Sequence, residues 1–429
     1  LGAFAALASQ TRAGWVGLAA AAALSLPALA GWLRRRWPIV IGAVAALAIV
    51  AAVSPVGPRL ASALDFADGT ARGRIDEWQV GATVVVNHPL TGVGFEGYRI
   101  AFAEGVDADY ERRYTRATMP DRAHNGPLDV GAAAGLPGML LYLAAAGFLI
   151  RRAWRAGRTG NAVTAGIAAG VVGYLAQQFF LFPLAEVDPL FWLFAGVLVA
   201  QSAGAPTARL DVKRGIWLVP AGLAAVALVA GILDVAADRQ LEKAGDLSSR
   251  GELDAAYNAA DAASGLRPDS IRYHFSAAAT AGQGGSPDWL SLAIVRLQDA
   301  LNLSPGDPIL RAEHASFRLR LAGVTRDAGL LAEATREWEE LVADDPVHAR
   351  YRLELGNAYA LGGNGPLAEA QWLITADLAP RSAAPFTNLA ILYLEDGRVD
   401  SARSALDQAK RIDPVAAEIE AIERLLAEQ

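Results

Sequence analysis

Residues 383–416 read AAPFTNLAILYLEDGRVDSARSALDQAKRIDPVA. Apolar and small residues recur in this stretch at helical spacing on both sides of Gly397, which predicts two short helices joined by a turn. Pro414 stops the second helix, and Pro380 stands 34 residues before it at the end of a similar stretch. The sequence therefore predicts helical hairpins that repeat about every 34 residues.

This period is the tetratricopeptide spacing. Weaker units end at Pro346, Pro305 and Pro268, so we expect about five repeats within residues 236–429, capped by a final helix near 415–428. Small residues let the paired helices approach, and Tyr, Trp and Leu side chains fill the seam. Such an α-solenoid usually binds a peptide or a protein partner on its concave face. The alternative interpretation is a structural spacer.

The chain has 429 residues with two different charge balances. Residues 1–235 hold 19 Lys+Arg and 15 Asp+Glu, whereas residues 236–429 hold 19 and 30. No basic face stands out, which argues against nucleic acid as the main partner. The absence of cysteine excludes disulfides, thiolate nucleophiles and Cys-ligated metals. Because the chain begins with Leu1, we expect it to be a piece of a longer protein.

Residues 1–235 contain apolar segments long enough to cross a membrane. Between the second and third segments, a loop at about 58–128 carries 8 Arg and 10 Asp+Glu and cannot lie in hydrocarbon. We therefore predict an all-α protein, a polytopic transmembrane bundle followed by the solenoid. The six predicted spans are 13–33, 38–57, 129–150, 162–182, 188–203 and 215–234.

The cations predict the orientation of these spans. Clusters at 34–36, 151–158 and 209–214 fall on one side of the predicted bundle, which the positive-inside rule assigns to the cytoplasm. The loop 58–128 and the repeats 236–429 then lie outside, in a bacterial periplasm. We thus expect a multi-pass inner-membrane protein in contact with membrane lipids.

Four side chains are predicted to gather at the outer membrane face: Arg12, Arg72, Arg74 and His124. Arginine offers a planar fork of donors that suits a diphosphate, and a neutral histidine can take a proton from a sugar hydroxyl. The alternatives are a surface histidine and an Arg12 that reaches for lipid headgroups. A further run, Arg112, Arg113 and Arg116, is interpreted as solvated.

One motif is interpreted as a turn. Gly92-Val-Gly94-Phe-Glu-Gly97 matches the spacing of a dinucleotide fingerprint, but that fingerprint needs a strand before it and a helix after it. Here Asn87-His88-Pro89-Leu90 precedes it directly. The glycines are therefore expected to form a tight turn beside the membrane.

Taken in order, these motifs resemble those of the bacterial O-antigen ligase and O-antigen polymerase superfamily. The resemblance covers about residues 5–200 and rests on Thr11-Arg12-Ala-Gly-Trp, Arg74…Trp78, Pro89-Leu-Thr-Gly-Val-Gly94, His124-Asn125…Leu128 and Gly135-Leu-Pro-Gly138. Asp129 stands where a glutamate is common in the family. The family usually has about a dozen spans, so its amino-terminal half is expected to lie outside this sequence.

The resemblance implies an inner-membrane glycosyltransferase that takes a glycan from undecaprenyl diphosphate, with no metal and no other cofactor. His124 would activate the acceptor hydroxyl, while Arg12 and Arg74, with Arg72 a third, would hold the diphosphate. The acceptor would be lipid A–core for a ligase, another glycan for a polymerase, or a protein. The repeats suggest a protein partner. The alternative from another class is a non-catalytic membrane-anchored scaffold that recruits envelope proteins.

Overall fold

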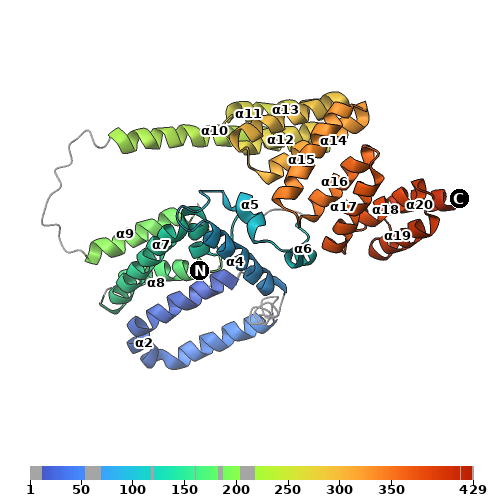
Figure 1. Ribbon diagram of the computed structural model, residues 1–429. Helices are drawn as coiled ribbons and strands as arrows, with labels where there is room; N and C mark the ends of the chain where they lie inside the picture. The colour runs from blue at the N-terminus through green and yellow to red at the C-terminus, as the bar shows by residue number, and fades with distance from the viewer. Residues whose placement is uncertain are drawn as a thin grey trace. The chain divides into compact units, whose positions relative to one another are not determined.

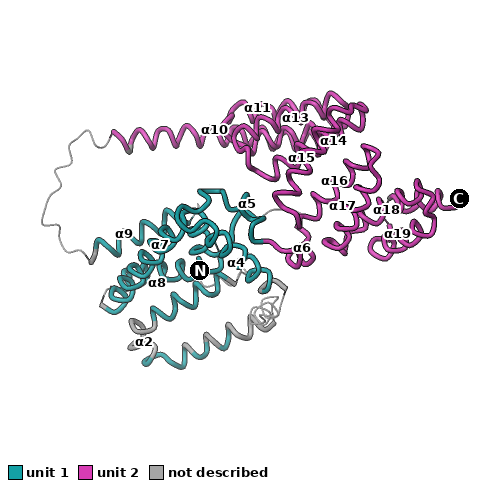
Figure 2. Tube along the Cα trace, in the orientation of Figure 1, with its two compact units in different colours: residues 1–105, 120–210 teal, residues 106–119, 211–429 magenta. Residues whose placement is uncertain are grey.

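The computed structural model describes residues 12–53, 69–116, 120–159, 161–181, 187–202, 218–415 and 417–427. Every regular element within these ranges is a helix, which confirms the predicted all-α class (Figure 1). The chain divides into two compact units (Figure 2). Unit 1 comprises residues 1–105 and 120–210, and unit 2 comprises residues 106–119 and 211–429.

Unit 1 is built around helix α8 (Ala162–Gln177), which packs against both α2 (Arg12–Val53) and α7 (Gly126–Thr159). Two glycines make the approach of α2 possible, because a Cβ placed on Gly17 would lie 2.7 Å from the carbonyl oxygen of Gly173. Further helices complete the unit: α4 (Gly69–Asn87), α5 (Tyr98–Ala101), the 3₁₀ turn η1 (Phe102–Gly105) and α9 (Asp188–Ser202).

Two of these helices are broken inside. The α2 helix loses helical geometry at Arg36, within the cation cluster between the first two predicted spans. The α7 helix breaks at Gly135, whose φ of 68° lies in the left-handed region. A Cβ on Gly131 would lie 3.3 Å from the sulfur of Met139. Residues eight apart in a straight helix are separated by about 12 Å, so the chain folds back at Gly135.

Two described helices are long and apolar enough to cross a membrane, Gly126–Arg158 and Ala221–Ser249. The break at Gly135 interrupts the first of these helices, so the third predicted span, 129–150, is not one straight helix, and the second contains most of the sixth predicted span. The helices Ala13–Ser25, Ala162–Gln177 and Asp188–Ala200 are apolar but shorter, and each covers only part of the first, fourth or fifth predicted span. The second predicted span, 38–57, runs from α2 into residues outside the described ranges.

Unit 2 consists of consecutive helix pairs. The long α10 (Leu218–Ser249) pairs along its carboxyl-terminal part with α11 (Leu253–Leu266), and four hairpins follow before α20 (Ala417–Ala427). Buried Trp338, Trp372 and Tyr393 fill successive seams. The intermediate pairs are α12 (Ile271–Gly282) with α13 (Pro287–Leu303), α14 (Pro308–Thr325) with α15 (Ala328–Asp344), α16 (Ala349–Leu361) with α17 (Gly365–Leu378), and α18 (Ala384–Glu395) with α19 (Val399–Ile412).

Candidate functional site

The carboxylate of Glu77 links two of the predicted site residues in unit 1. The Nη1 atom of Arg74 lies 3.6 Å from Oε2 of Glu77, one turn later on α4. The Nδ1 atom of His124 lies 3.3 Å from the same oxygen. A carboxylate facing Nδ1 favours the tautomer with its proton on that nitrogen, which makes Nε2 the basic one. The arrangement suits a histidine that takes a proton from a substrate.

The sequence alone does not single out Glu77. A signal is present, because residues three apart on a helix share a face and Glu77 stands three residues after Arg74. Without a structure, however, nothing distinguished Glu77 from the adjacent Asp76.

Local hydrogen bonds fix the backbone around His124. The residue itself has a φ of 53°, in the left-handed region that side chains other than glycine rarely adopt. Asp129 accepts a hydrogen bond from the backbone N–H of Ala123 at 2.7 Å. Asn125 accepts one from the N–H of Leu128 at 3.1 Å, in the first turn of α7. The side chains of Asn125 and Asp129 therefore fix the backbone on both sides of His124 and hold it in an unfavourable conformation. Backbone strain of this kind is common at functional sites.

The other two predicted arginines are placed differently. Arg72 is exposed on α4. Residues two apart on a helix are about 200° apart around its axis, so Arg72 and Arg74 lie on opposite sides of α4. Arg12 is the first residue of α2, and its side chain lies outside the described part of the chain. The structure thus brings together Arg74 and His124, but not Arg72.

The glycine-rich stretch near residue 92 packs against the break in α7. The N–H of Val93 donates to the carbonyl of Ala132 at 2.7 Å, and the N–H of Leu136 donates to the carbonyl of Pro89 at 2.8 Å. A Cβ on Gly92 would lie 2.4 Å from the carbonyl oxygen of Ala132. The stretch is therefore a tight turn that supports the site, as predicted, and it contacts backbone where a phosphate-binding loop would need open space.

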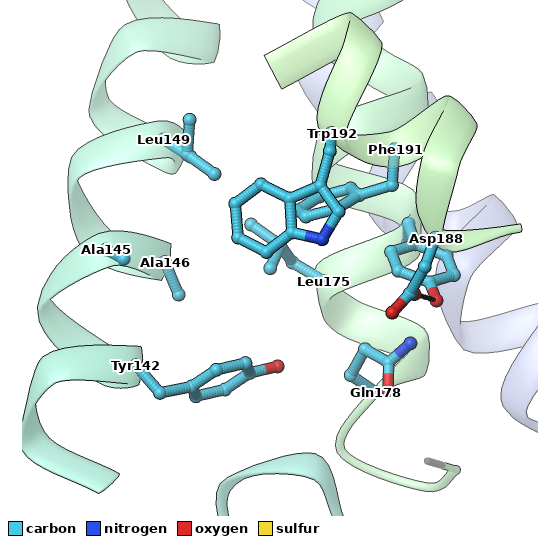
Figure 3. Close-up of a pocket in the computed structure, with 10 residues that line it drawn as sticks. Tyr142, Ala145, Ala146, Leu149, Leu175, Gln178, Asp188, Phe191 and Trp192 are labelled. Atoms are coloured by element: carbon cyan, nitrogen blue, oxygen red, sulfur yellow. Dashed lines mark hydrogen bonds between the residues drawn. The ribbon is translucent and has the colours of Figure 1, made fainter. Parts of the chain in front are cut away.

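A small cavity lies between α7, α8 and α9 (Figure 3). Its volume is about 50 Å³, and the lining residues that carry polar side-chain atoms are Tyr142, Tyr174, Gln178, Asp188 and Trp192. The Tyr174 hydroxyl donates to Asp188. Gln178 is 2% exposed, and neither polar atom of its side chain has a hydrogen-bond partner.

In unit 2, a piece of the predicted external loop docks on the repeats. We call residues 106–116, which include α6 (Ala108–Tyr114), the docking segment. Arg116 donates from Nε to Glu111 at 2.6 Å and from Nη1 to Asp345 at 2.7 Å. Glu111 also accepts a hydrogen bond from the backbone N–H of Ala349 at 3.0 Å, at the start of α16. The prediction of a solvated run is therefore wrong for Arg116, whose side chain is 2% exposed.

Further contacts extend the docking segment to the next turn of the array. Arg112 pairs with Asp377 at 2.8 Å, and Arg381 donates to the carbonyl of Arg113 at 2.6 Å. Ala108 packs against a small cluster that includes Leu378 and Ala379. The segment therefore occupies the edge of the array where α15 leads into α16 and α17 leads into α18.

Burial and neighbouring charges shift the pKa values of Arg116 and His348 at this edge of the array. Although burial opposes its charge, hydrogen bonds and the negative charges of Asp345 and Glu111 raise the pKa of Arg116. Next to it, burial lowers the pKa of His348 to about 2, and the charges of Arg116 and Arg350 act in the same direction. His348 stacks on Tyr351 with ring centroids 3.7 Å apart. The edge thus holds a permanently charged arginine beside a neutral histidine.

Solved structures similar to this chain include several tetratricopeptide-repeat proteins. A protein from Thermus thermophilus is 22% identical, with 45% of this chain and 100% of that one covered and a TM-score of 0.36. One from Parabacteroides merdae is 13% identical, with 66% and 99% covered and a TM-score of 0.37. The type IV pilus biogenesis factor PilW is 16% identical, with 45% and 89% covered and a TM-score of 0.36.

The comparison with curated proteins found no match. A family model matches the amino-terminal third of the chain, where the helix with Arg74 and Glu77 and the turn with His124 are found. It also covers the glycine-rich turn and the break in α7. Residues 1–143 match the O-antigen ligase family, which confirms the resemblance carried by the loop motifs.

Proposed function

We propose that this chain belongs to an inner-membrane glycosyltransferase that moves a glycan from undecaprenyl diphosphate to an acceptor hydroxyl. The observation that carries the proposal is the meeting of Arg74 and His124 at Glu77, inside the region that matches the O-antigen ligase family. The transfer needs a base for the hydroxyl and a cation for the departing diphosphate. Those are the two groups that lie beside this carboxylate.

In the proposed reaction, Nε2 of His124 removes the proton of the acceptor hydroxyl. The oxygen attacks the anomeric carbon, and the bond from that carbon to the diphosphate oxygen breaks. The lipid diphosphate leaves with both electrons of that bond, and its charge is offset by Arg74 and, as the family resemblance implies, Arg12. Direct displacement inverts the anomeric centre. No step requires a metal or another cofactor.

The proposal includes a topology and a division into two domains. Six spans within residues 1–235 would place the loop 58–128 and the repeats 236–429 on the periplasmic side, with Arg72 at the same face. The two long apolar helices support part of this arrangement. The cation clusters at 34–36, 151–158 and 209–214 support the orientation.

The test is complementation of a strain that lacks the gene, with surface glycan read by gel. The full-length protein is compared with its His124→Ala, Arg74→Ala and His88→Ala variants. His88 is the matched control, since it lies in the same loop but pairs with Glu104 at 2.9 Å. We expect the first two variants to lose transfer by about 10²-fold or more and His88→Ala to retain it. Wild-type transfer by a folded His124→Ala protein would rule out the proposed base.

The pattern of loss identifies the acceptor. Loss of attached glycan from lipid A–core indicates a ligase, and collapse of chain length to one unit indicates a polymerase. Loss of glycoprotein bands with an unchanged ladder indicates a protein acceptor.

No change in any glycan favours the second candidate function, a scaffold. The specific observation that favours a scaffold is that the repeat array already binds a charged segment of its own chain.

A further inference from the structure

The α10 helix contains most of an apolar run whose two ends are marked by charges. Residues 215–233 contain no charged side chain, and the run lies between Arg214 and Asp234. At about 1.5 Å for each residue the run is about 28 Å long, which matches the ~30 Å hydrocarbon core of a bilayer. A charge within hydrocarbon is costly, so we expect Asp234 to mark the edge of the core.

Ion pairs and hydrogen bonds fix the turn between α11 and α12 just beyond this edge. Arg267 pairs with Asp234. One helical turn further along α10, Asp238 accepts hydrogen bonds from Nη1 of Arg272 at 2.8 Å and from the hydroxyl of Tyr273 at 3.0 Å. The height of the turn along α10 is therefore set by contacts with the first two charged residues after the apolar run.

An apolar groove lies beside this turn. Its volume is about 500 Å³, and residues of α10 and of the turn line it. Val226 and Val229 belong to its α10 wall and precede Asp234 by eight and five residues, a distance of about 7–12 Å along the helix axis. Leu266 and Pro268 line it from the turn. The turn therefore adjoins a stretch of α10 that the length of the apolar run assigns to hydrocarbon.

The docking segment occupies the same edge of the array. Each hairpin repeats the same order of helices, so the connections from one hairpin to the next lie at one edge. The docking segment contacts that edge where α15 leads into α16 and where α17 leads into α18. It belongs to the predicted external loop 58–128, whose two ends continue into predicted spans. Its position independently supports an edge that faces the membrane.

We propose that the α11–α12 turn, residues 266–270, rests in the lipid headgroups of the periplasmic leaflet, with acyl chains filling the groove along α10. The occupant is lipid because the α10 wall of the groove continues the predicted span, whose large apolar side chains are exposed in the described chain. The turn combines apolar Leu266 and Pro268 with charged Arg267 and Asp269, a mixture that suits the boundary between hydrocarbon and water. The inference rests on the proposed topology and adds a contact between the repeats and the membrane.

The test measures the depth of two labelled positions on the first hairpin. Gly265→Cys places a thiol beside the turn, and Gly245→Cys places one on α10 eleven residues after Asp234, about 16 Å further along the axis. Both glycines lie at exposed helical positions, and a Cβ on either meets nothing within 4 Å. Because the chain contains no cysteine, each variant introduces a single thiol into it, and the thiol is labelled with the fluorophore NBD.

The labelled full-length protein is placed in vesicles of phosphatidylethanolamine and phosphatidylglycerol that contain a lipid with a nitroxide on its headgroup. We expect this nitroxide to quench the label of Gly265→Cys at least about threefold more strongly than that of Gly245→Cys, since the headgroup layer is only about 5–8 Å thick. Equal quenching at the two positions would overturn the contact.

A third label identifies what fills the groove. Val229→Cys places it in the α10 wall, where a nitroxide deep in the acyl chains should quench it. A label at this position that such lipids do not reach would show that another helix fills the groove, and it would overturn lipid as the occupant.

The variant His124→Ala separates this inference from the proposed reaction. Its quenching pattern should equal that of the parent protein, because the contact does not depend on transfer. Loss of transfer in His124→Ala together with equal quenching at the two glycine positions would leave the reaction standing and remove the contact. Full transfer by His124→Ala with strong quenching at Gly265→Cys would remove the proposed base and leave the contact standing.

Discussion

Arg116 donates two hydrogen bonds to Asp345, at 2.7 and 3.1 Å, across 229 positions of the chain. The first residue belongs to the predicted external loop and the second to the end of the α15 helix, yet both lie in unit 2. Both side chains are almost fully buried. A planar guanidinium facing a carboxylate with two parallel hydrogen bonds is among the stronger ion pairs in proteins. The repeats therefore recognise a specific segment of their own chain.

Arg116→Ala should release the docking segment. It would leave Asp345 and Glu111 buried without their counter-charge, a loss of about 3–5 kcal/mol for the docked state. Because the chain contains no cysteine, Ala108→Cys with Ala379→Cys gives a clean cross-linking pair in full-length protein. We expect cross-linking to fall sharply with Arg116→Ala. It should persist with Arg113→Ala, which removes an equal charge from the same segment at an exposed position. Equal yields in both would contradict the docking.

The array should lose stability as the pH falls below about 6.5, the usual pKa of histidine. Folded His348 has a pKa of about 2, so between pH 6.5 and 2 the unfolded chain binds a proton that the folded chain does not. The free energy of unfolding then decreases by up to about 1.4 kcal/mol for each unit of pH lost. His348→Phe keeps a ring beside Tyr351 and cannot titrate. Its unfolding free energy, measured from pH 7 to 5, should depend less steeply on pH than that of the wild type. Parallel curves would show that His348 does not titrate in this way.

Glu77→Gln should impair His124 without displacing it. An amide in place of the carboxylate no longer selects the Nδ1–H tautomer and no longer stabilises the imidazolium that forms during proton transfer. We expect kcat to fall on the order of 10²-fold, with a changed pH profile and intact protein. Glu104→Gln is the matched control, since Glu104 pairs with the other loop histidine, His88. The role assigned to Glu77 fails if both variants lose activity equally.

Two glycine substitutions should differ in their effect on stability, because Gly92 lies in a tight turn against backbone atoms and Gly166 has open space beside it. Gly92→Ala would place a methyl group 2.4 Å from the Ala132 carbonyl at a φ of 65°, so we expect a loss of stability of about 2 kcal/mol or more. Gly166→Ala on α8 meets nothing within 4 Å and should be neutral or slightly stabilising. Thermal unfolding of the two purified variants in detergent measures the difference. A stable Gly92→Ala protein would show that the turn does not need its close backbone contact.

Local patterns in the sequence predicted a large part of this structure. The 34-residue spacing of Pro380 and Pro414 indicated the hairpins, because each hairpin repeats the same short-range packing. The positions of Arg74 and His124 indicated one site, because the loop motifs matched a family pattern that contains both. These inferences depend on residues close in the chain or on an ordered set of motifs.

Long-range pairings escaped prediction for a physical reason. Arg112, Arg113 and Arg116 have the same charge and similar neighbours in the sequence, and only the fold determines that Arg116 is buried. Its partner Asp345 is one of many acidic residues in the repeats. Likewise, Gln178 follows an apolar helix and carries no signal of its own. Its burial and the hydrogen bond from Gly126 to its carbonyl join residues 52 positions apart, which only the fold brings together.

The α10 helix runs without interruption from its apolar residues into the first hairpin of the array. A helix turns by about 100° and rises about 1.5 Å for each residue, so the number of residues in α10 fixes the direction that the first hairpin faces about the helix axis. One inserted residue would rotate the hairpin by about 100°, whereas seven would restore its facing to within about 20° at a shift of about 10 Å. The length of α10 thus sets the direction that the first hairpin faces about the axis of that helix. Insertions of one to seven residues in α10 would change this direction in known steps.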